Sequence, residues 1–143
     1  MMKYLILLVL YFQCLLNSVG QSCFIEYPYR NINTRSKEGQ EGVFLIRDRI
    51  RFEESCTNAS NLVVDFKNEY VIGFVYRNHG CSKPKIYLEF KNNPGSCELE
   101  CNLVIENTGG CKLDFSVNKW IVIQKPDDRI TVVPRIIKTT IIY

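Results

Sequence analysis

The chain has 143 residues, of which 46% are hydrophobic and 23% charged, a composition typical of a folded domain rather than a disordered segment. Its formal net charge of +3 is too small to predict nucleic acid as a partner. The longest apolar run, residues 5–16, is too short to cross the roughly 30 Å hydrocarbon layer of a membrane. We therefore expect no membrane span.

Residues 1–20 are predicted to be a secretory signal peptide. Lys3 supplies a positive charge, residues 5–16 form an apolar core, and the small residues Ser18 and Gly20 match a cleavage site. Cleavage after Gly20 predicts a secreted, extracellular chain that begins at Gln21. A buried N-terminal helix is the alternative, but no helical pattern continues beyond this point.

Residues 21–41 are predicted to be an irregular N-terminal segment, and residues 42–143 a single β domain. Runs rich in Val, Ile, Phe, Tyr and Leu alternate with Asn, Gly and Pro, which is typical of short strands joined by turns. We expect turns at residues 78–80, 92–95 and 108–110, and strands at residues 43–52, 62–66, 70–77, 85–91, 97–106, 111–123 and 129–143. No segment shows helical periodicity. The sequence therefore predicts an all-β fold, either an antiparallel β-sandwich or a flattened barrel.

The C-terminal residues 130–143 are strongly apolar and would promote aggregation if they were left exposed. We expect them to pack as a terminal strand, broken at Pro134. Contact with a partner is the alternative.

Removal of the signal peptide leaves an even number of cysteines, which in an oxidising compartment predicts three disulfides that staple the domain. Their pairing stays open. The six residues are Cys23, Cys56, Cys81, Cys97, Cys101 and Cys111. A metal site is the alternative, but the chain has a single histidine and no Cys-x-x-Cys pair, so we predict no metal and no cofactor.

Asn58-Ala59-Ser60 is the only Asn-x-Ser/Thr sequence in the chain. It lies in a polar stretch and predicts a glycosylated surface loop at Asn58. Such sequences often stay unmodified, so the unglycosylated form remains the alternative.

Nothing in the sequence singles out a catalytic residue. His79 is the one side chain expected to titrate near neutral pH, and its neighbours Asn78 and Gly80 predict an exposed turn in which it is dispensable. No serine lies in a Gly-x-Ser-x-Gly context, and there is no phosphate-binding glycine loop. We therefore predict a protein that is not an enzyme.

The clearest candidate binding feature in the sequence is a set of three arginines, Arg47, Arg49 and Arg51. On a strand, residues two apart project from the same face, so the three guanidinium groups would form a row about 7 Å apart. Such a row can bind sulfate, phosphate or an acidic partner. The alternative is a solvated strand face that discourages edge pairing.

Three segments together resemble the insect multiprotein-bridging-factor-two family. They are residues 42–55 (GVFLIRDRIRFEES), residues 86–88 leading to the turn at 93–96, and Gly109-Gly110 followed by residues 113–120 (LDFSVNKW). The resemblance implies a secreted protein, since many members are described as probable salivary secreted peptides. The co-activator role in the family name is not expected here, because a signal peptide and disulfides place the chain outside the nucleus.

Together these observations predict a secreted, non-enzymatic interaction protein of saliva, venom or haemolymph that binds another extracellular protein or a polyanion. A secreted hydrolase that uses carboxylates is one alternative, and a structural protein of an extracellular matrix or coat is another.

Overall fold

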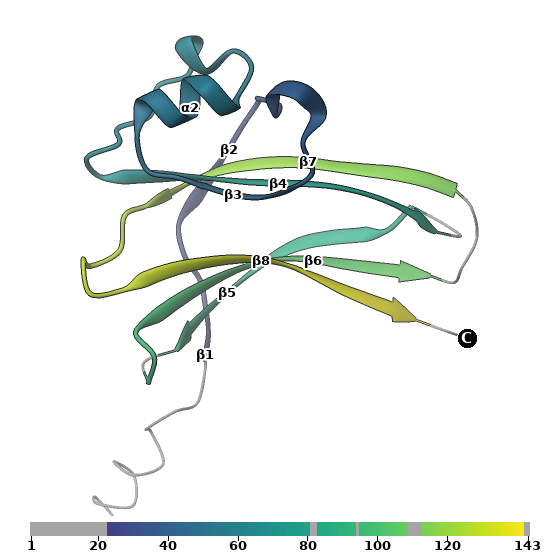
Figure 1. Cartoon of the computed structure of the whole chain (residues 1–143). Coiled ribbons are helices and arrows are strands. Elements are labelled where there is room, and N and C mark those ends of the chain that lie inside the picture. Colours follow the sequence, from purple (N-terminus) through teal and green to yellow (C-terminus); the bar gives the residue numbers. More distant parts are fainter. Residues whose placement is uncertain (1–22, 81–82, 94, 109–112, 142–143) are drawn as a thin grey trace, which may run out of the picture.

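Two four-stranded β-sheets stack face to face in the computed structural model, which describes residues 23–80, 83–93, 95–108 and 113–141 (Figure 1). Sheet A has the strand order β1-β5-β6-β8, and sheet B has the order β2-β7-β4-β3. Neighbouring strands are antiparallel, except that β6 and β8 are parallel. The strands are β1 (Cys23–Ile25), β2 (Tyr29–Ile32), β3 (Gly42–Ile46), β4 (Glu69–Gly80), β5 (Lys85–Asn93), β6 (Glu98–Thr108), β7 (Leu113–Gln124) and β8 (Thr131–Ile141). The predicted all-β fold is confirmed, whereas the predicted antiparallel arrangement is wrong at β8, which runs parallel to β6.

The inner core fills the space between the two sheets. On β6, alternate residues from Leu99 to Ile105 point inward, as the two-residue period of a strand requires. The buried members are Ile72, Phe74, Phe90, Leu99, Cys101, Leu103, Ile105, Val117, Ile121, Ile123 and Val132. This core holds the two sheets together.

The C-terminal segment packs as the edge strand β8, which confirms the predicted terminal strand. Val132 is buried in the inner core, and Ile136 packs against it. Pro134 does not interrupt β8. An edge strand tolerates proline because one side of its backbone needs no partner in the sheet.

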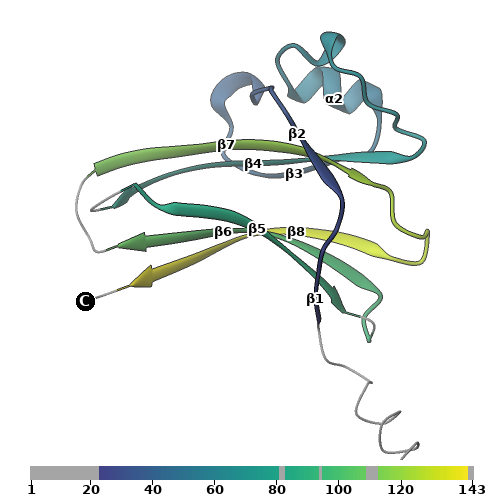
Figure 2. The ribbon, with the colours of Figure 1, turned by 180° about the vertical axis from the view of Figure 1, so that it is seen from behind.

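The segment predicted to be irregular, residues 21–41, contains two strands. β1 pairs with the Phe90–Asn92 end of β5, and β2 pairs with the Trp120–Ile123 end of β7. Figure 2 shows this part of the chain passing from one sheet to the other along the side of the sandwich. Strands of three and four residues are too short to produce a clear alternation, so the sequence pattern did not reveal them. A short 3-10 helix, η1 (Lys37–Gly39), follows β2.

A second, outer core lies on the face of sheet B that points away from sheet A. Residues 47–66, which include α2 (Arg49–Ser55) and the 3-10 helix η2 (Ala59–Asn61), cover this face (Figure 1). The buried members are Ile46, Phe52, Cys56, Ala59, Val64, Val71, Val75, Trp120 and Val122. The Trp120 ring lies across Gly73, where a Cβ atom would be only 2.3 Å from Cζ3. Glycine is therefore required beneath the indole.

The strand predicted at residues 43–52 is wrong beyond Ile46, because β3 ends there and α2 begins at Arg49. The carboxylate of Asp48 accepts a hydrogen bond from the Arg51 amide at 2.8 Å, which caps the first turn of α2. The helix then directs Phe52 into the outer core, while Ile50 stays exposed. The alternation of apolar residues over 43–52 is typical of a strand, but the Asp48 cap starts a helix within this segment.

Residues 62–66 form no strand either, and they pass over the outer core as a loop. Val64 is buried there, and the amides of Asn68 and Glu69 donate to the Asp65 carbonyl to form a turn before β4. The loop reaches the core without pairing with a neighbouring strand.

The turn predicted at residues 78–80 is wrong, because β4 continues to Gly80 in register with Leu113. Asn107 donates from Nδ2 to the His79 carbonyl, and its side chain lies where a Gly80 Cβ atom would be. The glycine permits this close approach and forms no turn. The turn predicted at residues 92–95 begins later, because Asn92 and Asn93 still belong to β5 and the Ser96 amide donates to the Asn93 carbonyl. Residues 94 and 109–110 lie outside the described residues.

A candidate binding groove on sheet B

One end of sheet B narrows to a two-stranded ribbon that α2 does not cover. β3 pairs only with residues 71–75 of β4, and β2 pairs only with residues 120–123 of β7. Residues 76–80 and 113–117, the β4–β7 ribbon, therefore pair only with each other in the described part of sheet B. Figure 1 shows this end of β4 and β7 extending beyond α2.

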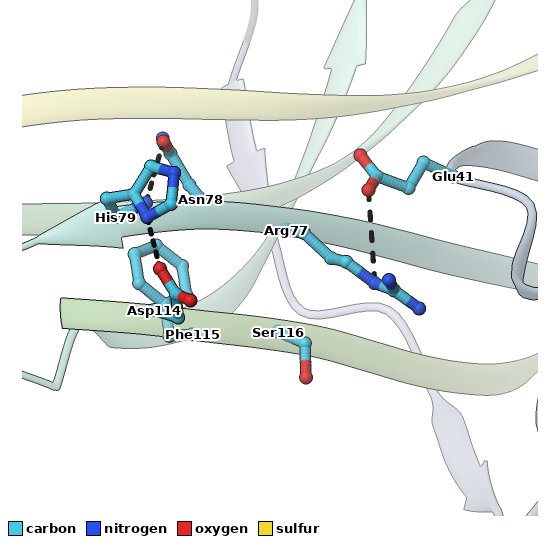
Figure 3. Close-up of a pocket in the computed structure, with 7 residues that line it drawn as sticks. All are labelled: Glu41, Arg77, Asn78, His79, Asp114, Phe115 and Ser116. Carbon is cyan, nitrogen blue, oxygen red and sulfur yellow. Dashed lines mark hydrogen bonds and ion pairs between the residues drawn. The ribbon is translucent and has the colours of Figure 1, made fainter. Parts of the chain in front are cut away.

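Two adjoining hollows lie along the outer side of the ribbon and form the β4–β7 groove. The first has a volume of about 560 Å³ and is lined by Glu41, Arg77, His79, Asp114 and Ser116, among others (Figure 3). The second has a volume of about 470 Å³ and extends toward residues 32–36. Arg77 and Ser116 line both hollows, so the two form one continuous groove.

Charges of both signs line the first hollow, in two exposed pairs (Figure 3). His79 Nδ1 contacts Asp114 Oδ1, and Arg77 Nε lies 3.9 Å from Glu41 Oε1. The Arg77 side chain is 66% exposed. Exposed pairs of this kind contribute little to stability, because water and salt screen them. Their charged groups can therefore turn to an incoming partner at small cost.

His79 lies on a strand and not in a turn, although its side chain is exposed as predicted. Among the described residues, no hydroxyl or thiol group makes a hydrogen bond with its ring. The Ser116 hydroxyl lies on the neighbouring strand and points away from the His79–Asp114 pair (Figure 3). The described part of the groove therefore shows no hydroxyl or thiol nucleophile hydrogen-bonded to the histidine, as a Ser–His or Cys–His pair would have.

The predicted row of Arg47, Arg49 and Arg51 does not form, because these residues do not share a strand. Arg47 precedes the helix and places its guanidinium 5.6 Å from the Tyr70 ring centre. Arg49 lies 5.8 Å from the Phe66 ring centre and donates from Nη1 to the carbonyls of Ala59 and Leu62.

Arg51 is two residues further along the helix, and residues two apart point to different sides of a helix. The three arginines alternate with other residues in the sequence, and this spacing places them on one face only if the segment is a strand. Because Arg49 and Arg51 lie in α2 instead, the row cannot form.

Cys56 and Cys101 form no disulfide, so the prediction that all six cysteines pair does not hold for these two. Cys56 is buried in the outer core and Cys101, on β6 of sheet A, in the inner core, so sheet B lies between them. Burial raises the pKa of the Cys56 thiol to about 11 and that of Cys101 to about 12. Cys81, Cys111 and the side chain of Cys23 lie outside the described residues.

Asn58 lies on the surface, as predicted for a glycosylation loop. Asn58 and Ser60 are exposed, whereas Ala59 between them is buried in the outer core. Asn58 has φ of 57°, a left-handed conformation that asparagine adopts more readily than most residues. Glycosylation itself stays a prediction.

Sequence reasoning did not single out Arg77, Asp114 or Ser116, and it placed His79 in a turn. Arg77 and His79 are two apart on β4, and Asp114 and Ser116 are two apart on β7, so each pair lies on one face of its strand. Only the register between β4 and β7 brings the two pairs together. That register was hidden because residues 78–80 were interpreted as a turn.

No helix in the described part of the chain is long and apolar enough to cross a membrane. Comparison with models of known protein families, with curated proteins and with solved structures finds no match.

Proposed function

We propose that the chain is a secreted, non-enzymatic binding protein that engages an extracellular protein through the β4–β7 groove. The observation that carries this proposal is the ribbon itself. It projects beyond α2 with Arg77 exposed at the junction of two hollows. Exposed segments held by a rigid sheet are common binding surfaces.

The charges in the groove favour a protein over a polyanion as the partner. Glu41 and Asp114 lie beside Arg77 and His79, so a uniformly acidic polymer would meet repulsion along with attraction. A protein surface presents both signs and can complement both. The dispersal of Arg47, Arg49 and Arg51 removes the row of cations that a polyanion would have needed.

Secretion rests on residues 1–20, which lie outside the described residues, and on the resemblance to the multiprotein-bridging-factor-two family. In an oxidising compartment we expect Cys23, Cys81, Cys97 and Cys111 to form two disulfides. Cys56 and Cys101 would then remain as buried thiols. We further expect a glycan on Asn58, at the start of η2.

The His79–Asp114 contact favours a second candidate, a hydrolase that uses these side chains as acid and base. A carboxylate bound to Nδ1 orients an imidazole for proton transfer at Nε2. Activity of the secreted protein on generic ester, amide or glycoside substrates, lost in His79→Ala with the fold intact, would establish this candidate and overturn the non-enzymatic one.

Affinity capture from the fluid or tissue that the secreted protein meets tests the groove. Arg77→Glu should abolish capture, because it reverses the charge at the junction of the hollows. Arg51→Glu, the same change at an exposed position on α2, should leave capture unchanged. Equal capture by both variants, with matched circular dichroism spectra, would contradict the proposal.

Heparin chromatography tests the polyanion alternative. The proposal predicts that wild type and the variant with Gln at positions 47, 49 and 51 elute together at low salt. Retention of wild type, abolished in this triple variant, would restore the polyanion interpretation.

A further inference from the structure

A second hollow of a different character lies on the side of the sandwich where the chain passes from sheet A to sheet B. It has a volume of about 410 Å³ and is lined by residues of β1, β5, the connection between β1 and β2, and the first residue of β2. Four of its lining side chains are aromatic: Phe24, Tyr27, Tyr29 and Phe90. We call it the aromatic hollow.

The rings of the aromatic hollow are held in place by their neighbours. Tyr27 and Tyr29 each pack against Phe90, with ring centres 5.6 and 5.7 Å apart. The Tyr27 hydroxyl donates to the Gln124 carbonyl at 3.0 Å. Phe24 and Tyr29 nevertheless remain 67% and 45% exposed. A preformed site that keeps large rings accessible is a feature of ligand-binding surfaces.

Two carboxylates, Glu26 and Glu89, line the same hollow. Neither makes a hydrogen bond or an ion pair with any described residue. By contrast Glu100, which lies opposite Lys91 on the neighbouring strand β6, is paired with Arg135 at 3.6 Å. The hollow thus combines electron-rich ring faces with negative charge that has no partner within the described chain.

The protein already places an ammonium group beside this hollow. Lys91 Nζ lies 4.6 Å from the centre of the Phe24 ring, within the range of a cation–π contact. One face of the Phe24 ring is therefore occupied by the chain's own cation, so a ligand would have to place its charge at the carboxylates instead.

We propose that the aromatic hollow binds a small organic ammonium ion with an aromatic or aliphatic body. Its ammonium group would lie between Glu26 and Glu89, and its apolar body against Tyr29 and Phe24. Charge pairing with the two carboxylates favours a cation, apolar contact with the rings favours an organic body, and the volume suits a ligand of this size. The site is distinct from the β4–β7 groove and shares no lining residue with it.

Titration of the mature chain with 2-phenylethylammonium, followed by amide NMR shifts, tests the proposal. Saturable shifts are expected at residues 24–29 and 88–90, with a dissociation constant in the millimolar range. The double variant Glu26→Gln, Glu89→Gln should weaken binding by about tenfold, because it removes both charges and keeps both shapes. Glu54→Gln, which neutralises an exposed carboxylate on α2 that has no partner among the described residues, should bind like wild type.

2-Phenylethanol, which has a neutral hydroxyl where the probe has its ammonium, should bind much more weakly. Three results would overturn the proposal: equal binding of 2-phenylethanol, wild-type affinity in the well-folded double variant, or shifts that fail to saturate at residues 24–29.

Discussion

The two ends of the β4–β7 pair differ in what covers them, although the same two strands form both. At one end, residues 71–75 are buried on both faces, between the inner core and the outer core beneath α2. At the other end, Arg77, His79, Asp114 and Ser116 remain on an open face. One antiparallel ladder thus provides stability at one end and a candidate binding surface at the other.

The local sequence follows this division. Residues 71–75 read VIGFV, a continuous apolar run of the kind found where a strand is buried on both faces. Residues 76–80 read YRNHG, in which apolar and polar residues are mixed. The change from one pattern to the other falls where the cover provided by residues 47–66 ends.

Phe52→Ala is expected to have the largest effect on stability, because the Phe52 side chain is fully buried between α2 and sheet B. Loss of the ring should lower the free energy of unfolding by about 3–5 kcal/mol, measured by urea denaturation. Ile50→Ala, on the exposed side of the same helix, is the matched control and should cost far less. Similar losses in the two variants would contradict the assignment of the outer core to this face.

The two buried thiols allow the inner and outer cores to be compared without mutation. Because burial raises the pKa of Cys56 to about 11 and of Cys101 to about 12, both should resist alkylation at pH 8 in the folded chain. In denaturant without reductant, both should be labelled. Absence of label in denaturant would show that they are paired after all.

The raised pKa values of the two thiols also make the stability of the fold depend on pH. The unfolded thiols ionise near their ordinary pKa of 9, while the folded thiols stay protonated. Their contribution to stability is therefore complete below about pH 9 and falls as the pH rises through about 11. Urea denaturation at pH 8 and pH 10 should show this decline, and Cys101→Ala should reduce it.

Gly73→Ala should destabilise the covered end by about 1–3 kcal/mol, because the new methyl group would displace the Trp120 indole. Trp120 is the only tryptophan of the chain, so its fluorescence reports the displacement directly. Ser116→Ala, at an exposed position of β7, is the control. Unchanged fluorescence and stability in Gly73→Ala would show that the ring does not lie across Gly73.

Asp48→Ala should cost about 1 kcal/mol by removing the cap of α2. Asp48→Asn, which retains an oxygen acceptor, should keep most of that stability. Equal losses in the two variants, measured by thermal denaturation, would argue against a capping role.

His79→Ala should have the smallest effect on stability, less than about 0.5 kcal/mol, since its pair with Asp114 is exposed. Asp114→Asn should behave alike. A loss well above this value in either variant, in the same denaturation assay, would show that the open end contributes more to stability than its exposure indicates.

The sequence predicted the all-β class because strands β5, β6, β7 and β8 each carry a long apolar pattern. It failed at Asp48, where one capping hydrogen bond converts an apparent strand into α2. It also failed at Gly80, which resembles a turn residue but accommodates Asn107 in a continuous strand. The groove could not be predicted, because it depends on the pairing of Arg77 with Ser116 and of His79 with Asp114, which only the register defines.

Amide hydrogen exchange along β4 and β7 tests the contrast between the two ends most directly. We predict that the amides of Val71, Ile72 and Ile121 exchange only with global unfolding, because both faces around them are covered. The amides of Arg77, His79 and Ser116 should exchange much faster through local opening of the ribbon. Equal protection at both ends, or stronger protection in the ribbon, would contradict the account.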